Sequence, residues 1–326
     1  MDDMVHAINI DAAAELERFY AMVESDKARL SGREYLSQWL FADILAARNT
    51  RTEMNFYGFD GAEHVWKFFC WIRSTRFADY FDADQIDPLI ALSAERDQNA
   101  LARLGISRDL ELFENVGRYN AQDYLFQRAY PVPAHQRVHR HLEFGGGHGR
   151  AANLAFSATD SGIELMTLVD AIPGPYLSQR AYLEALGLRV TDALEHSGEG
   201  LDLDAVAHSS DVLHIPTWRM EDLPDASHDM VSCVQVLKEL PRQVALYAIG
   251  QFARVLKPGG ALYVRDHPQF HSPNHLPMDV LLQSAGFVLE FAPHIHDRVE
   301  VHGLPRIWRK LNPNNFLQAN EVAVTP

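Results

Sequence analysis

Four glycines fall within five positions of one short segment, which reads EFGGGHGR over residues 143–150. Glycine keeps side chains out of a ligand's path and permits backbone conformations that other residues avoid. An acidic residue, Asp170, follows 21 positions after Gly149, at the end of an apolar run. A glycine-rich turn after one strand and a carboxylate at the tip of the next are the parts of a nucleoside-cofactor site, because the carboxylate can accept hydrogen bonds from the ribose hydroxyls.

The letters around the turn argue against two common nucleotide sites. A dinucleotide fingerprint counted from Gly145 needs a third glycine where this chain has Arg150. A P-loop needs Gly-Lys followed by Ser or Thr, and none follows the turn. A tight strand-to-helix connection without a ligand is the alternative, since one glycine-rich turn is a weak signal. Four glycines exceed what a turn requires, so we expect a cofactor.

A second group of side chains, suited to proton transfer, stands at the ends of two later β-type runs. Glu239 follows residues 229–236, and Asp266 and His267 stand at the end of residues 260–266. Open α/β sheets bind ligands beyond the carboxyl ends of their strands. We therefore expect Glu239, Asp266 and His267 to converge on one crevice.

The elements that would position these residues follow an alternating pattern. From His141 onward, β-type runs alternate with helical patterns, which predicts a Rossmann-like, doubly wound, mostly parallel sheet. The predicted strands cover residues 141–144, 163–171, 211–218, 229–236 and 260–266. Two last β-type runs, 287–293 and 303–311, are close enough in the chain to pair antiparallel. The polar stretch 195–211 is expected to be a loop or insertion.

The first third of the chain has the periodicity of packed helices. Apolar residues recur at helical spacing within 16–23 and 65–72, and Ser31 and Glu34 have capping-box spacing. We predict an α-helical N-terminal domain over residues 1–125, acting as a lid, a substrate-binding region or an oligomerisation region. The cofactor-binding α/β domain would cover 126–326. Aromatic residues in the helices are compatible with a homodimer and equally with a monomer's core.

Composition excludes several classes of partner. The net charge is −15, the wrong sign for binding nucleic acid or an anionic membrane. The two cysteines, Cys70 and Cys233, stand far apart and suggest neither a disulfide framework nor a metal site. The first residues lack the pattern of a signal peptide, and no apolar run is long enough to span a bilayer. A cytoplasmic protein is the expectation.

Four separated motifs resemble those of class I S-adenosylmethionine-dependent methyltransferases. They are HLEFGGGHGR (141–150), LVDA (168–171), EDLPDASHDMVSCVQVLKELP (221–241) and ARVLKPGGALYVRD (253–266), and they occur in the order and spacing of that family. The resemblance covers about residues 138–310. Within the superfamily, the LEFGGGHG turn and the VLKELP segment are most similar to the bacterial sugar O-methyltransferases.

The resemblance implies roles for particular positions. The methionine end of the cofactor would lie against Glu143, Gly145 and Gly147, and Asp170 would hold the ribose. The product would be S-adenosyl-L-homocysteine.

At the other end of the cofactor, the resemblance places Met220 against the adenine ring and Glu221 or Asp222 near its amino group. Arg219 departs from the family, in which many members have an acidic residue at that position. Cys233 and Gln235 would lie beside the sulfonium, although Cys233 also fits a small buried apolar residue.

Methyl transfer to a hydroxyl needs a group that accepts the hydroxyl proton, and such a group raises the rate by about 10² to 10⁴. His267 is our first choice, because an ordinary imidazole is mostly neutral at cytoplasmic pH. Asp266 would orient His267 or bind substrate, and Glu239 would bind substrate or replace it as base. Tyr119 and Tyr124 are candidate lid residues, with Tyr119 against the substrate.

A metal is the weaker alternative. His267, His271 and His275 recur at helical spacing, but two prolines interrupt the helix, so no metal-binding pattern is assigned. Glu239 and Asp266 could nevertheless hold a divalent ion that acidifies a sugar hydroxyl.

Three functions remain open from the sequence. The first is O-methylation of a small molecule with a sugar-like hydroxyl. The second is N-methylation of an amine or guanidinium, such as that of arginine, which the acidic surface favours. The third is a non-catalytic subunit that keeps the fold and the cofactor.

The choice of base can be tested directly. His267→Ala is expected to lower kcat by about 10² to 10⁴, because it removes the proton acceptor. Glu239→Gln is expected to raise KM more than it lowers kcat. Full turnover in His267→Ala, together with loss of turnover in Glu239→Gln, would assign the base to Glu239 instead.

Overall fold

The computed structural model of the chain describes residues 7–37, 55–72, 80–107, 111–129, 138–195, 201–266, 277–293 and 303–311. His267, His271 and His275, which the sequence analysis singled out, lie outside these described residues. So do the N-terminal six residues and the segment 38–54.

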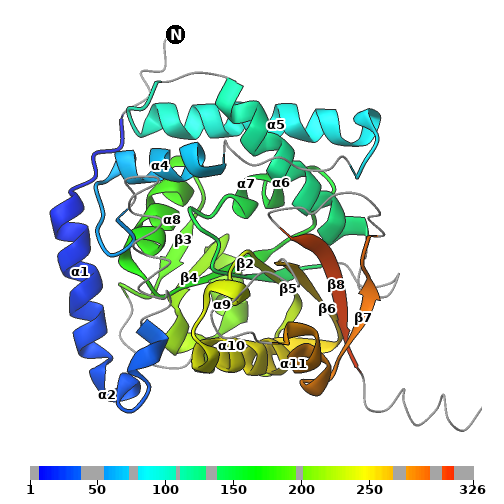
Figure 1. Ribbon diagram of the computed structural model, residues 1–326. Helices are drawn as coiled ribbons and strands as arrows, with labels where there is room; N and C mark the ends of the chain where they lie inside the picture. Colours follow the sequence, from blue (N-terminus) through cyan, green and yellow to red (C-terminus); the bar gives the residue numbers. More distant parts are fainter. Residues whose placement is uncertain are drawn as a thin grey trace, which may run out of the picture.

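One eight-stranded sheet forms the centre of the described structure (Figure 1). Its strands are β1 (Arg140–Phe144), β2 (Leu165–Asp170), β3 (Val190–Asp192), β4 (Val212–Pro216), β5 (His228–Val234), β6 (Leu256–Asp266), β7 (Phe287–Phe291) and β8 (Leu304–Lys310). The spatial order is β3-β4-β2-β1-β5-β6-β8-β7. Strands β1 to β6 run parallel, and β8 pairs antiparallel with both β6 and β7. This confirms the predicted mostly parallel sheet with antiparallel C-terminal strands.

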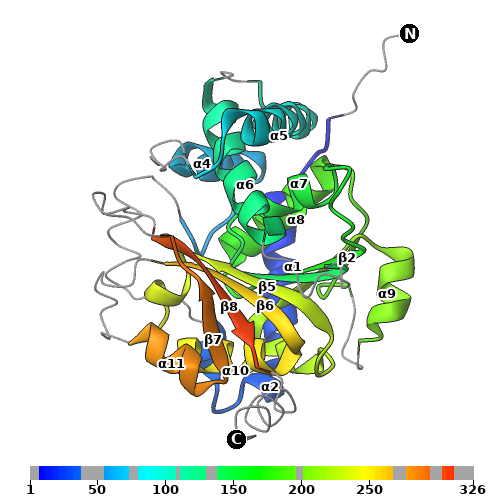
Figure 2. The ribbon, with the colours of Figure 1, turned by 90° about the vertical axis from the view of Figure 1, so that its right-hand side faces the viewer.

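Helices cover both faces of the sheet, which Figure 2 shows nearly edge-on. Helices α4 to α8 lie on one side, and α10 and α11 lie on the other. The helical elements are α1 (Ala12–Ser25), α2 (Lys27–Leu30), η1 (Glu34–Ser37), α4 (Ala62–Ile72), α5 (Ala83–Arg103), α6 (Glu111–Ala129), α7 (Ala151–Ala155), α8 (Pro173–Ala185), α9 (Leu203–Ser209), η2 (Thr217–Asp222), η3 (Leu237–Glu239), α10 (Arg242–Val255) and α11 (Met278–Ser284). A helical region thus precedes the sheet, as predicted.

Three short elements differ from the sequence-based expectation. The stretch 195–211 contains α9, which begins where the Asp202 side chain accepts hydrogen bonds from the Asp204 and Ala205 amides. Strand β3 was not predicted, because its three residues are too few to show a period. The Ser31–Glu34 capping box does not form as expected, since Glu34 accepts from the Gly32 amide and η1 begins at Glu34 itself.

The N-terminal helices share a core with the sheet domain. Phe19 of α1 packs edge-on against Tyr176 and Trp218, and Phe69 of α4 packs against Tyr182. One buried apolar cluster includes residues from α1, α4, α5, α8 and the strands. None of the described helices combines the length and apolar character that a bilayer crossing requires.

A buried carboxylate on α6 joins the helical region to the carboxyl edge of the sheet. Asp123 accepts hydrogen bonds from Tyr263 Oη at 2.5 Å and from Arg265 Nη1 at 2.8 Å, and it also pairs with Arg150. The Tyr119 ring lies against both guanidinium groups, with its centroid 3.8 Å from Arg150 Cζ and 4.7 Å from Arg265 Cζ. Burial opposes ionisation of Asp123, but the two arginines outweigh it, so its pKa is lowered from the ordinary value.

Removing this charge is expected to destabilise the fold. Asp123→Asn leaves two buried guanidiniums without their shared carboxylate, so we expect the free energy of unfolding to fall by about 3–5 kcal/mol. Denaturant unfolding measures this. The matched control is Asp225→Asn, which removes an exposed partner of Arg254 and should cost at most about 1 kcal/mol. Equal effects of the two substitutions would contradict the central place of Asp123.

Candidate functional site

The glycine-rich turn leaves β1 at the carboxyl edge of the sheet. Gly145, Gly147 and Gly149 have φ values of 73°, 62° and 83°, which only glycine adopts readily. Gly146 is crowded instead, because a Cβ there would lie 2.7 Å from Glu143 Oε2. Residues 145–147 are partly exposed, whereas Glu143 beneath them is buried. The turn is therefore a bare stretch of backbone that a ligand can approach.

Glu143 has an unsatisfied oxygen under this turn. Its Oε2 atom is buried and has no hydrogen-bond partner. Burial raises the pKa of Glu143 to about 7, while Arg150 opposes that rise. An unpaired carboxyl oxygen in such a place is costly unless a ligand or a proton satisfies it.

Asp170 stands at the tip of β2, as predicted, and is already oriented by the chain. Its Oδ1 accepts from the Ala171 amide at 2.8 Å and the Ile172 amide at 3.4 Å, and its Oδ2 accepts from Gln179 Nε2 at 2.9 Å. Burial raises its pKa to about 7 against these hydrogen bonds. A carboxylate offers about four acceptor positions, so at least one remains for a further donor.

Residues of the helical region pack against the glycine-rich turn and the start of α8. Phe68 of α4 lies 3.8 Å from the position that a Cβ on Gly147 would take. The Phe56 carbonyl accepts from the Gly174 amide at 2.9 Å, which ties the segment before α4 to the start of α8. His64 is buried beside it, with Nδ1 on Asp60 at 2.7 Å and Nε2 without a partner.

The segment η2, which the sequence analysis placed at the adenine, is held by charges from the N-terminal residues. Asp26, between α1 and α2, accepts from Arg219 Nε at 2.6 Å and from Trp218 Nε1 at 2.9 Å. Arg29 Nη1 donates to both oxygens of Asp222 at 2.7 Å.

The remaining charge of η2, Glu221, pairs with Arg33, and Met220 is fully buried in the apolar core. The acidic partner of Arg219 is therefore supplied by Asp26, from a distant part of the chain. The sequence analysis missed these partners, because charged residues 188–193 positions apart carry no local signal.

Acidic side chains also gather near the end of β5. Cys233 is fully buried, and burial first, then the charges of Asp266, Glu143 and Glu239, raise the pKa of its thiol. Gln235 adopts a left-handed φ of 60°, and its amide donates to the Arg265 carbonyl at 2.9 Å. A non-glycine residue in that region is strained, and such strain occurs preferentially at functional sites.

Asp266 ends β6 and lies within electrostatic reach of Glu239. Burial raises the pKa of Asp266 to about 7, Glu239 raises it further, and Lys238 and Arg306 oppose the rise. Neither Asp266 oxygen has a hydrogen-bond partner of normal geometry, although the Lys238 amide faces the carboxylate. Glu239 and Asp266 thus lie on the same edge as Glu143, and His267 lies outside the described residues.

The two tyrosines proposed as lid residues are both engaged with the chain. Tyr119 is buried between Arg150 and Arg265, and Tyr124 Oη donates to Asp160 at 2.6 Å. Within the described part of the chain, no three His, Cys, Asp or Glu side chains are grouped closely enough to hold a metal ion.

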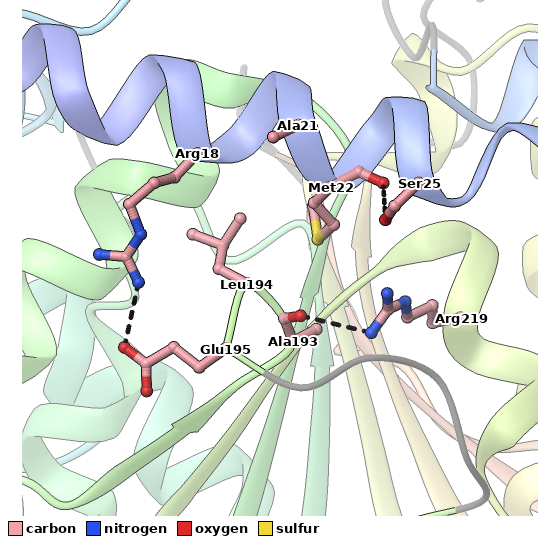
Figure 3. Close-up of a pocket in the computed structure, with 8 residues that line it drawn as sticks. All are labelled: Arg18, Ala21, Met22, Ser25, Ala193, Leu194, Glu195 and Arg219. Carbon is pink, nitrogen blue, oxygen red and sulfur yellow. Dashed lines mark hydrogen bonds and ion pairs between the residues drawn. The ribbon is translucent and has the colours of Figure 1, made fainter.

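A cavity of about 300 Å³ lies beside this edge, between α1 and the residues after β3 (Figure 3). It is lined by Arg18, Ala21, Met22, Ser25, Ala193, Leu194, Glu195 and Arg219. Its charged residues already pair within the chain, since Arg18 donates to Glu195 at 3.3 Å and Arg219 Nη1 donates to the Ala193 carbonyl at 3.3 Å. The candidate site is therefore the glycine turn and its neighbouring strand ends, not this cavity.

The residues at the glycine turn fit the cofactor that the sequence resemblance implies. A bare backbone and the free Glu143 oxygen suit the charged amino-acid end, and Asp170 is oriented to accept from the ribose. Buried carboxyl groups around Cys233 suit a cationic sulfonium, because they attract positive charge most strongly where water is excluded.

Comparison with known proteins finds one family model that matches part of the chain. The model of a family described as a methyltransferase domain matches residues 142–264, which run from β1 through β6. No curated protein matches the chain.

Several solved structures are similar in part. The N-methyltransferase NodS from Bradyrhizobium japonicum, in complex with S-adenosyl-L-homocysteine, shares 14% identity over 69% of this chain and 100% of its own, with a TM-score of 0.42. An S-adenosylmethionine-dependent methyltransferase from Aquifex aeolicus shares 14% sequence identity over 71% of this chain and 100% of its own, with a TM-score of 0.39. A further S-adenosylmethionine-dependent methyltransferase, from Methanosarcina mazei, shares 16% sequence identity over 56% of this chain and 98% of its own, with a TM-score of 0.38. Likenesses this weak carry no information about the acceptor.

The raised pKa values predict a pH-dependent preference for a cationic ligand. Glu143 and Asp266 change from mostly protonated at pH 6 to mostly ionised at pH 8, because each pKa is about 7. S-adenosylmethionine carries a sulfonium charge that S-adenosyl-L-homocysteine lacks. The ratio of their affinities should therefore shift towards S-adenosylmethionine by roughly three- to tenfold over this range.

Calorimetry at several pH values measures both dissociation constants. Glu143→Gln removes one titrating group and should flatten part of the shift. Parallel pH profiles for the two ligands in the wild-type protein would show that these carboxyl groups do not act on the sulfonium.

Proposed function

We propose that this protein is an S-adenosylmethionine-dependent methyltransferase that transfers a methyl group to the hydroxyl of a small, sugar-like acceptor. The observation that carries the proposal is the gathering of buried carboxyl groups at one edge of the sheet, where Glu143, Glu239 and Asp266 all act on Cys233. An uncharged hydroxyl must lose a proton during transfer, and such groups can orient the hydroxyl and accept that proton.

The cofactor, when bound, supplies an electrophilic methyl carbon on sulfur. In the proposal, the amino-acid end of the cofactor lies against Glu143, Gly145 and Gly147, and Asp170 binds its ribose. Met220 packs against the adenine, and Cys233 lies beside the sulfur. Glu221 is proposed to lie near the adenine amino group. Its ion pair with Arg33 means that the N-terminal segment helps to hold it there.

The acceptor would lie towards Glu239 and Asp266. The acceptor oxygen forms its bond to the methyl carbon as the carbon–sulfur bond breaks, and the electron pair of that bond stays on sulfur. The hydroxyl proton goes to a base of the protein, for which His267 is the first candidate, with Asp266 and Glu239 binding or orienting the acceptor. Tyr119 is proposed to support the acceptor side through its contact with Arg265.

Two alternatives follow from the same residues. An anionic pocket also suits N-methylation of a cationic amine or guanidinium. A non-catalytic protein that binds the cofactor is the second alternative, since a fold does not secure an activity. We favour the hydroxyl acceptor because the sequence motifs most resemble those of the sugar O-methyltransferases, and because Asp266 can accept a hydrogen bond from a hydroxyl.

Incubation with S-adenosylmethionine and separate pools of sugars and amino acids tests the proposal. A methyl increment, detected by mass spectrometry, is expected in the sugar pool. An increment only among the amino acids would favour the N-methylation alternative. Cofactor binding with no increment in either pool would favour the non-catalytic alternative.

Asp170→Ala is the control for cofactor dependence. Loss of a charge-assisted hydrogen bond to the ribose should weaken S-adenosylmethionine binding at least about tenfold and abolish the increment. Repeating the assay with a chelator tests the divalent metal that the sequence left open. Absence of any cofactor binding by the wild-type protein would overturn the proposed function.

A further inference from the structure

Two buried ionisable side chains lie near the carboxyl edge of the sheet and do not pair with each other. Asp266 of β6 and Arg306 of β8 are 2% and 3% exposed. In the antiparallel pairing, Val264 is opposite Arg306 and Asp266 is opposite Leu304. Directly opposite residues share a face, and so do residues two apart, so Asp266 and Arg306 lie on the same face of the sheet.

Both groups have hydrogen-bonding atoms that nothing satisfies. Apart from the Lys238 amide, which faces the carboxylate, nothing satisfies the oxygens of Asp266, and Nε and Nη2 of Arg306 have no partner. Arg306 uses only Nη1, which pairs with Asp279 in the first turn of α11. Arg306 is near enough to Asp266 to lower the pKa of its carboxyl group, yet no ion pair joins these two described residues.

This arrangement is unfavourable for a protein by itself. Buried polar groups are almost always hydrogen-bonded, and a buried donor or acceptor left without a partner destabilises the folded state. A carboxylate and a guanidinium that lie on one face within electrostatic reach, but do not pair with each other, could both be satisfied by one ligand. A ligand that satisfies both explains why the pair persists.

The free atoms of Arg306 determine which ligand group fits. Nε and Nη2 form one edge of the guanidinium, with two parallel N–H bonds that match the two oxygens of a carboxylate. Asp266, as an acceptor, suits a hydroxyl hydrogen. The two side chains thus offer a donor pair and a hydroxyl acceptor.

We propose that the acceptor is a hydroxylated carboxylate, whose carboxylate binds the Nε–Nη2 edge of Arg306 while its hydroxyl donates to Asp266. This inference rests on the proposed function, because it identifies the acceptor class of the same site. Arg306 is the residue that determines specificity for the acid over the corresponding neutral sugar.

Calorimetry on the protein loaded with S-adenosyl-L-homocysteine tests the inference with D-galacturonate and D-galactose, which differ in the carboxylate. The loaded wild-type protein should bind galacturonate at least about tenfold more tightly than galactose. Arg306→Gln should abolish this preference and leave the dissociation constant of S-adenosyl-L-homocysteine unchanged. Arg306→Lys should keep part of the preference, since it keeps the charge but loses the paired N–H bonds.

Asp279→Asn is the matched control, because it removes the existing partner of Arg306 but leaves its free edge. It should keep the preference for galacturonate. Equal binding of the two sugars, binding of neither, or an undiminished preference in Arg306→Gln would each overturn the inference while the proposed function stands. Failure of the wild-type protein to bind either S-adenosylmethionine or S-adenosyl-L-homocysteine would instead overturn the proposed function and this inference with it.

Discussion

The charge on Asp123 is the constraint on which the arrangement of this protein depends. It lies on α6, before the sheet begins, yet it pairs with Arg150 at the end of the glycine turn and with Arg265 at the end of β6. Two guanidiniums cannot be buried this close together without an anion between them. Arg150 also explains why the turn departs from the dinucleotide pattern, since the position of a third glycine is used for an ion pair.

The carboxyl edge of the sheet combines strong burial with an excess of acidic groups. Glu143, Asp170 and Asp266 each have a pKa near 7, because burial disfavours their charged forms. Groups in this state can be neutral when the site is closed on itself and ionised when a cation is near. Such an edge suits a cationic methyl donor better than a neutral or anionic cofactor.

The N-terminal segment contributes to the same edge through complementary charges. Asp26, Arg29 and Arg33 follow one another at helical spacing, and they meet Arg219, Asp222 and Glu221 of η2. Asp26 thereby balances the buried charge of Arg219, so that each charged residue of η2 has a partner of opposite sign among the N-terminal residues. The helical region and the sheet accordingly share one apolar core as well as these ion pairs.

The sequence by itself determined the alternating α/β organisation, the glycine turn after β1, Asp170 at the tip of β2 and the C-terminal antiparallel strands. These features depend on periodicity and on glycine's backbone freedom, which act between near neighbours and can be read from short segments. Short elements such as β3 and α9 were not predicted, because three to seven residues contain too few turns or alternations to show a hydrophobic period. Only the tertiary structure decided that Arg150 and Arg265 share Asp123, that Asp26 pairs with Arg219, and that Arg306 and Asp266 lie on one face without pairing with each other. Burial and ion pairing join residues up to 193 positions apart, and no local pattern encodes which partners folding will bring together.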